Sequence, residues 1–137
     1  MYLLDTDILS NLMKRAPSTI LIAKLASIPV EQQFTSSITL GELVYGAWYA
    51  TGRTAFFLQQ LESLVTTHLP ILPFDTLAAN HYGEIRAQLE AQGTPLGDAD
   101  LRIAAIALAR GLTVVTGNVR HFHRVPGLSI ENWLEPS

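Results

Sequence analysis

Cysteine is absent from the 137 residues of this chain. Its absence excludes a disulfide framework and any metal site built on thiolates, such as a structural zinc site. The absence is compatible with a reducing compartment, and we expect a cytoplasmic protein.

Long apolar runs are lacking too. The apolar tract in the C-terminal half is broken by Arg102, Arg110 and Gly111, well short of the roughly 20 residues that span a bilayer. Asp5 and Asp7 stand where a secretory signal needs a basic start and an uninterrupted apolar stretch. With 48% hydrophobic residues, the chain has enough apolar side chains for a compact core. We expect a soluble protein with no membrane partner, folded as a single domain over residues 1–137.

An overall excess of positive charge is also missing. The net charge is −3 at pH 7, so no global basic field indicates nucleic-acid binding. The distribution is uneven, because the C-terminal third is locally basic. Its cationic and histidine side chains are Arg102, Arg110, Arg120, His121, His123 and Arg124. For Arg110 taken alone, a solvated helix face is the expected position.

Hydrophobic periodicity predicts short strands separated by helices. The predicted strands are residues 2–5, 34–36, 112–116 and 128–130, with the proline-rich stretch 69–73 as an edge strand. The predicted helices are 8–14, 17–28, 39–50, 53–67, one capped by Asp75 and continuing past Leu89, and a buried helix over 101–110. This alternation implies right-handed crossovers and an α/β fold with a mainly parallel sheet covered on both faces.

Acidic residues stand at the junctions where such a sheet places functional sites. Asp5 follows the first strand, Glu42 lies one turn into the helix behind the second, and Asp100 opens the buried helix. Two unit charges 4 Å apart repel by about 4 kcal/mol at an effective dielectric of 20. A divalent cation removes this repulsion, and oxygen ligands without cysteine favour Mg²⁺ or Mn²⁺. Thr116 and Asn118 follow a later strand at the same edge.

Purely structural roles compete with this interpretation for some of the acids. Asp7 and Asp98 fit helix N-caps as well as they fit a site. Glu42 also fits a solvent-facing position on its helix.

Histidine and tryptophan offer weaker functional signals. His121 and His123 would point apart on a helix, and nothing nearby completes a tetrahedral set of metal ligands. Trp48 and Trp133 are expected to be packing anchors rather than stacking platforms for bases.

Four blocks of the sequence together carry a resemblance to a known family. They are LLDTDILS at the N-terminus, TSSITLGELVYGA at 35–47, GDADLRIAAIALARGLTVVTGNVRHF at 97–122 and LSIENW at 128–133. In this order and spacing, the chain resembles a PIN-domain ribonuclease of the VapC toxin type. The resemblance covers essentially the whole chain and implies a three-layer α/β/α domain with a central sheet of about five strands.

The resemblance also implies a site. The family's acid after the opening strand matches Asp5, the glutamate of its T-x-x-E-L block matches Glu42, and the acid that opens the buried helix matches Asp100. Asn118 stands where a fourth acid is common, so the sequence departs from the pattern there. Asp98 or Asp7 restores the lost charge, and Asp98 is favoured.

A metal-dependent endoribonuclease acting on structured RNA, often transfer RNA, is the implied activity. Bound Mg²⁺ or Mn²⁺ would activate a water for attack on a phosphodiester. Thr6 and Thr116 would position ligands or water, and Arg102, Arg120 and Arg124 would contact phosphates. Family membership further implies a VapB-like antitoxin and a toxin homodimer, with segment 43–48 as a possible part of the antitoxin surface, although core packing is the expected use of that segment.

Two other functions remain open at this point. A haloacid-dehalogenase-type phosphohydrolase also begins with D-x-D after a buried strand, but it needs a later lysine, and the only lysines are Lys14 and Lys24. A toxin-like module that has lost catalysis and only pairs with an antitoxin is the second alternative, and Asn118 is the argument for it.

Overall fold

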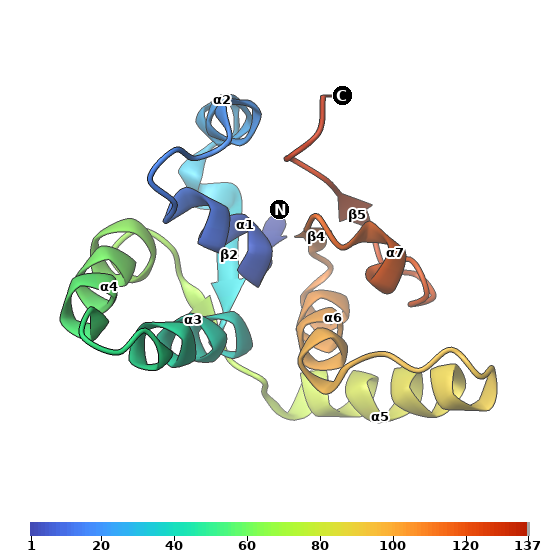
Figure 1. Ribbon diagram of the computed structural model, residues 1–137. Helices are drawn as coiled ribbons and strands as arrows, with labels where there is room; N and C mark the ends of the chain where they lie inside the picture. The colour runs from blue at the N-terminus through green and yellow to red at the C-terminus, as the bar shows by residue number, and fades with distance from the viewer. Residues whose placement is uncertain (137) are drawn as a thin grey trace.

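The computed structural model describes residues 1–136 and contains a five-stranded sheet flanked by helices (Figure 1). The strands are β1 (Tyr2–Leu4), β2 (Gln33–Ser36), β3 (Ile71–Leu72), β4 (Thr113–Val115) and β5 (Ile130–Glu131). Their spatial order is β3-β2-β1-β4-β5, and every neighbouring pair is parallel. The predicted α/β fold with a parallel sheet of about five strands is confirmed, and β1 lies at its centre.

The helices connect these strands. They are α1 (Thr6–Leu12), α2 (Thr19–Ser27), α3 (Ser37–Tyr49), α4 (Thr54–Leu61), α5 (Thr76–Ala91), α6 (Asp98–Arg110) and α7 (Val119–Phe122). A 3₁₀ turn over Val30–Gln32 precedes β2, and a π-helical turn over Glu62–Thr66 extends α4. None of the helices within residues 1–136 has the length and apolarity needed to cross a membrane.

Each face of the sheet has its own core, since consecutive side chains of a strand point to opposite faces. Leu3 and Val114 are fully buried on the face covered by α5, α6 and α7. Leu4 and Val115 are buried on the other face, against α1 to α4. The two groups of helices cover opposite faces of the sheet in a three-layer α/β/α arrangement, and in Figure 1 α3 and α4 lie at the left while α5 and α6 lie at the lower right.

Helix α6 is the buried helix that the sequence predicts. Six of its residues, including Ile103 and Ile106, are buried. It ends at Gly111, whose φ of +65° is left-handed and favours glycine. The Leu112 amide then donates to the Ala107 carbonyl at 2.9 Å and turns the chain into β4. The start of α6 and the end of β4 are thereby placed at one edge of the sheet.

Several predicted boundaries are wrong by one or two residues. Helix α1 begins at Thr6 rather than at residue 8, so the N-cap position offered to Asp7 is taken by Asp5. Helix α2 begins after Pro17, because the Ser18 side chain accepts the Leu21 amide at 3.2 Å and caps it. The expected Asp75 cap is confirmed, as its carboxylate accepts the Ala78 amide at 3.0 Å.

The expectation for the two tryptophans is half right. Trp133 is 2% exposed and its ring lies 5.0 Å from that of Tyr2, so it is a packing anchor. Trp48 is 65% exposed on α3, beside the exposed rings of Tyr45 and Tyr49. The prediction that Trp48 packs in the core is therefore wrong, because this side of α3 faces away from the sheet.

Candidate active site

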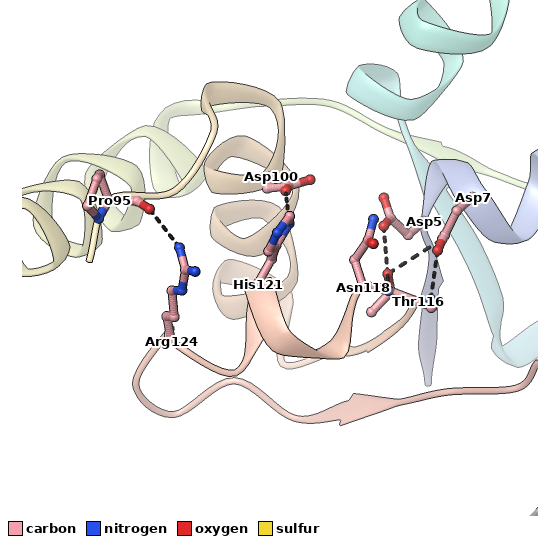
Figure 2. A network of polar contacts seen from close by, with 9 residues as sticks. Asp5, Asp7, Pro95, Asp100, Thr116, Asn118, His121 and Arg124 are labelled. Atoms are coloured by element: carbon pink, nitrogen blue, oxygen red, sulfur yellow. Dashed lines mark hydrogen bonds and ion pairs between the residues drawn. The ribbon is translucent and has the colours of Figure 1, made fainter. Parts of the chain in front are cut away.

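Asp5 directly follows the central strand and is 3% exposed. Its amide donates to the Val115 carbonyl at 2.9 Å, which ties the end of β1 to the end of β4. The Thr116 hydroxyl donates to the Asp5 carboxylate at 2.8 Å (Figure 2). The Asn118 amide in turn donates to that hydroxyl oxygen at 2.9 Å. Thr116 therefore holds the Asp5 carboxylate by a hydrogen bond, and its part in catalysis stays a prediction.

Asp7 belongs to the same group of residues and is not a helix cap. Its carboxylate accepts the Gly117 amide at 2.8 Å, across from α1 to the turn that follows β4. A Cβ atom on Gly117 would lie 2.7 Å from this carboxylate oxygen. A side chain at position 117 would therefore displace the Asp7 carboxylate, which the glycine allows to lie next to Asp5.

Glu42 reaches the site from α3. The Thr6 hydroxyl donates to its carboxylate at 2.6 Å and also lies 3.2 Å from the Thr39 hydroxyl. Ser36 caps α3 by accepting the Thr39 amide at 3.0 Å, which fixes the start of the helix at the end of β2. Glu42 is solvent-exposed, but its carboxylate is held toward the end of β1 rather than left free.

Asp100 approaches from the first turn of α6. Its side chain is 25% exposed, and one carboxylate oxygen lies 3.5 Å from the His121 Nδ1 on α7 (Figure 2). The sequence does not indicate His121 as a metal ligand, and the structure places its imidazole beside the Asp100 carboxylate. Nothing in the local sequence predicts this contact, since it depends on how α7 packs against α6.

Asp98 does not join these acids. Its carboxylate accepts the Tyr82 hydroxyl at 2.5 Å and the Arg102 Nε at 2.8 Å. Two residues along a helix correspond to a rotation of about 200°, so Asp98 and Asp100 point to different sides of α6. Asp98 is also not the N-cap of this helix, because Gly97 holds that position. The alternative, Asp7, is the acid that the structure brings beside Asp5.

Burial and crowding disfavour ionisation of two of these acids. The pKa of Asp5 is raised from 3.8 to about 7, first by burial and then by the nearby carboxylates of Asp7 and Asp100, against the lowering effect of the Thr6 amide and the Thr116 hydroxyl. Burial also raises the pKa of Asp100, with contributions from Glu42 and Asp7, while His121 opposes the rise. Such a site gains stability from any positive charge that enters it.

An open pocket of about 430 Å³ collects these groups. Its lining residues are Asp5, Thr6, Asp7, Ser10, Asn11, Lys14, Glu42, Asp100 and Asn118. Carboxylate, amide and hydroxyl oxygens are the donors that Mg²⁺ and Mn²⁺ prefer. Within residues 1–136, no three His, Asp or Glu side chains are grouped closely enough to hold a metal ion as they stand. The oxygen donors of the pocket match a hard cation in chemical type.

Three lining residues of the pocket were missed by the sequence analysis, although a signal for them existed. Ser10, Asn11 and Lys14 follow Asp7 at intervals of three, four and seven residues. This spacing places all four on one side of α1 and the turn that follows it. A polar stripe on a short helix directly after Asp5 indicates a surface that faces the site.

The arginines expected to contact phosphates lie outside this pocket. Arg102 is paired with Asp98, and its guanidinium lies 5.0 Å from the Phe74 ring centre and 5.3 Å from that of Tyr82. Arg124 donates to the Pro95 carbonyl at 2.9 Å (Figure 2). Arg120 is exposed on α7. None of the three lines the acidic pocket.

The fold and the pocket define a class of protein: a parallel α/β domain with clustered carboxylates where the central strands end. The family model described as PIN domain matches residues 2–128. The chain is 40% identical over 132 residues to the tRNA(fMet)-specific endonuclease VapC of Salmonella typhimurium, a match that covers 96% of this chain and 97% of that protein. The chain belongs to the PIN-domain family and, within it, to the VapC type.

Solved structures agree with this assignment. The crystal structure of DNA-bound VapBC from Salmonella typhimurium contains a chain that matches with a TM-score of 0.87 and 40% identity, covering 96% of this chain and 97% of that one. FitAcB from Neisseria gonorrhoeae matches with a TM-score of 0.91 and 29% identity over 99% of this chain and 100% of that one. The resemblance inferred from the four sequence blocks is therefore confirmed.

Proposed function

We propose that this chain is a metal-dependent endoribonuclease toxin that cleaves structured RNA and is held inactive by a cognate antitoxin. The observation that carries the proposal is the convergence of Asp5, Asp7, Glu42 and Asp100 on one pocket, with the pKa of Asp5 raised to about 7. The Salmonella typhimurium relative is named a tRNA(fMet)-specific endonuclease, and we infer transfer RNA as the first substrate to test.

Each residue has a distinct part in the proposed mechanism. Asp5 and Asp100 are the core ligands of Mg²⁺ or Mn²⁺, and Glu42, held by Thr6, completes the set directly or through water. Asp7, held by the Gly117 amide, supplies the negative charge that Asn118 lacks. Thr116 keeps the Asp5 carboxylate oriented toward the pocket. A bound cation in this position supplies a water of lowered pKa and neutralises charge on the phosphate.

The proposed partners follow from the family. Several matched structures are toxin–antitoxin complexes, among them VapBC from Salmonella typhimurium and VapBC2 from Rickettsia felis. We infer a VapB-like antitoxin and a homodimer of this chain. The exposed rings of Tyr45, Trp48 and Tyr49 on α3 offer an apolar surface for either contact. Leu43, by contrast, is buried, so only part of the predicted 43–48 segment is available.

Of the two alternatives, the phosphohydrolase is removed by membership in the PIN-domain family. The catalytically inactive binding module is the alternative that an experiment must separate from the nuclease.

The test is cleavage of a purified transfer-RNA pool by the antitoxin-free protein with Mg²⁺, with Mn²⁺ or with EDTA. Asp100→Asn is assayed beside it, and Asp98→Asn serves as the matched control on the same helix. Discrete fragments that need the metal, disappear with Asp100→Asn and persist with Asp98→Asn support the proposal. A folded wild-type protein that cleaves no RNA under any of these conditions contradicts it and favours the binding module.

A further inference from the structure

A second cavity continues from the acidic pocket along the surface. It has a volume of about 810 Å³ and runs between the end of α1, the side of α3 that carries Glu42 and Gly46, and the start of α4. We call it the α3–α4 groove. Thr6, Ser10, Lys14 and Glu42 line both this groove and the acidic pocket. A linear ligand that enters one of the two therefore meets the other.

The sequence of α3 keeps the groove open. Glu42, Gly46 and Ala50 are spaced by four residues, and Leu43 and Ala47 form the neighbouring row. Apart from Glu42, which lies at the pocket end, the first row consists of Gly46 and Ala50, whose side chains are absent or small. The apolar second row forms the floor together with Phe57.

The charges of the groove are opposite in sign to those of the pocket. Lys14, Arg15 and Arg53 line it, and all three are exposed. Within the part of the chain that the structure describes, none of these three side chains takes part in an ion pair. Glu42, at the junction with the pocket, is the only acid among the lining residues. The groove therefore presents unneutralised positive charge directly beside a site that acts on a phosphodiester.

Arg53 is held in place by two aromatic rings. Its guanidinium lies 4.8 Å from the ring centre of Phe56 and 4.9 Å from that of Phe57. Such contacts orient a cation while leaving its N–H groups available to other acceptors. Phe56 itself is 52% exposed, so an apolar ring stands next to the charge. Cations that track a backbone, interleaved with aromatic rings, are the composition of grooves that bind single-stranded nucleic acid.

We propose that the α3–α4 groove binds the RNA strand on one side of the scissile phosphate. Lys14 binds the phosphate nearest the acids, Arg53 binds one farther along, and Phe56 stacks on an unpaired base. This inference rests on the proposed ribonuclease function, which it extends by moving the phosphate contacts from Arg102, Arg120 and Arg124 to Lys14 and Arg53. Lys14 and Arg53 are positioning residues, since they act on the strand beside the reacting bond.

The test measures RNA binding rather than cleavage. Asp100→Asn provides a background that does not cut its ligand, and fluorescence anisotropy follows single-stranded oligoribonucleotides of about 4 and about 12 nucleotides at several salt concentrations. Lys14→Gln and Arg53→Gln are each added to this background, with Arg53→Lys as the conservative variant. Arg86→Gln is the matched control, because Arg86 is an exposed arginine on α5 that is paired with Glu90. Circular dichroism confirms that each variant is folded.

Each neutralised phosphate contact is expected to reduce the slope of log K against log salt by about 0.7 and to weaken binding of the longer RNA several-fold. We expect Arg53→Gln to leave binding of the shorter RNA unchanged and Arg53→Lys to restore the salt slope. Arg86→Gln should change binding of neither RNA. The inference is overturned if Lys14→Gln and Arg53→Gln keep the wild-type slope, even where they weaken binding of an antitoxin. It is also overturned if Arg53→Gln weakens binding of the shorter and the longer RNA equally. Wild-type protein that cleaves no RNA contradicts the proposed function instead, so the two failures are distinguishable.

Discussion

The acidic pocket and the α3–α4 groove lie side by side and share four lining residues, yet they hold their charges in opposite ways. In the pocket, carboxylates are crowded and partly buried, and burial raises the pKa of Asp5 and Asp100. In the groove, the cations Lys14, Arg15 and Arg53 are exposed, and none of them forms an ion pair within residues 1–136. Within residues 1–136, the acids whose pKa is raised are thus pocket residues, and the groove beside them carries exposed positive charge.

The largest loss of RNA cleavage is expected when one acid is removed from the pocket. We expect Asp100→Asn to reduce RNA cleavage by at least about 100-fold, because it removes the carboxylate of a proposed metal ligand in the first turn of α6. The fold should persist, since the Asp100 side chain is partly exposed and caps no helix. Cleavage rates and a circular dichroism spectrum measured on the same preparation check both statements. Activity within threefold of wild type would contradict the assignment.

Neutralising the buried acid should stabilise the metal-free protein. The folded pKa of Asp5 lies above its ordinary value, so the stability it contributes is fully present below about pH 4 and is lost as the pH rises through about 7. We expect Asp5→Asn to unfold less readily than wild type at pH 8 in EDTA, by about 2–4 kcal/mol, while abolishing cleavage. Urea unfolding at pH 5 and pH 8 measures the change. If the variant were less stable than wild type at pH 8, the ionised Asp5 carboxylate would not destabilise the folded protein, which contradicts the prediction.

Gly117→Ala places a methyl group next to Asp7 and tests whether the position of the Asp7 carboxylate matters for cleavage. The Cβ of Gly117→Ala would meet the Asp7 carboxylate at 2.7 Å, so the carboxylate must move and its bond to the amide is lost. We expect a loss of cleavage of roughly tenfold, the scale seen when a group that orients a metal ligand is removed. Gly83→Ala is the control, because a Cβ there meets nothing within 4 Å and α5 gains helix propensity. Equal activity for the two variants would remove Asp7 from the site.

The smallest change in cleavage is expected for an acid outside the pocket. Asp98→Asn breaks the pair with Arg102 on the far side of α6, and we expect cleavage to change by less than about threefold. Cleavage by this variant is measured beside Asp100→Asn, so that the two acids in the first turn of α6 are compared directly. A loss as large as that of Asp100→Asn would mean that Asp98, and not Asp7, completes the acidic set.

The sequence predicted the features that depend on local pattern. Apolar runs bounded by glycine and proline located the strands, and the rule that sites form at strand ends placed Asp5, Glu42 and Asp100 together. The structure places Asp7 in the pocket and the favoured Asp98 outside it, because the position of each acid depends on how far its helix rotates the side chain and not on spacing along the chain. Trp48 was misplaced because the outward side of α3 is as aromatic as a core face.

The groove lay beyond prediction for a different reason. It arises where α1, α3 and α4 pack together, which brings Lys14 and Arg53 to one surface although they are far apart in the sequence. A local excess of arginine pointed instead to the C-terminal third, where Arg102 and Arg124 form contacts within the protein. Charge counted along the chain does not reveal which cations are left unpaired by the fold.

The central claim, that the pocket acids form one cation site, is tested most directly by calorimetric titration of the metal-free protein with Mn²⁺. At about pH 6.5, in two buffers of different ionisation enthalpy, we predict binding that releases roughly half a proton or more, since Asp5 must give up its proton to a cation. Binding should be lost in Asp5→Asn and Asp100→Asn and retained in Asp98→Asn. Wild-type protein that binds no Mn²⁺, or binding unchanged by Asp5→Asn, would contradict the account.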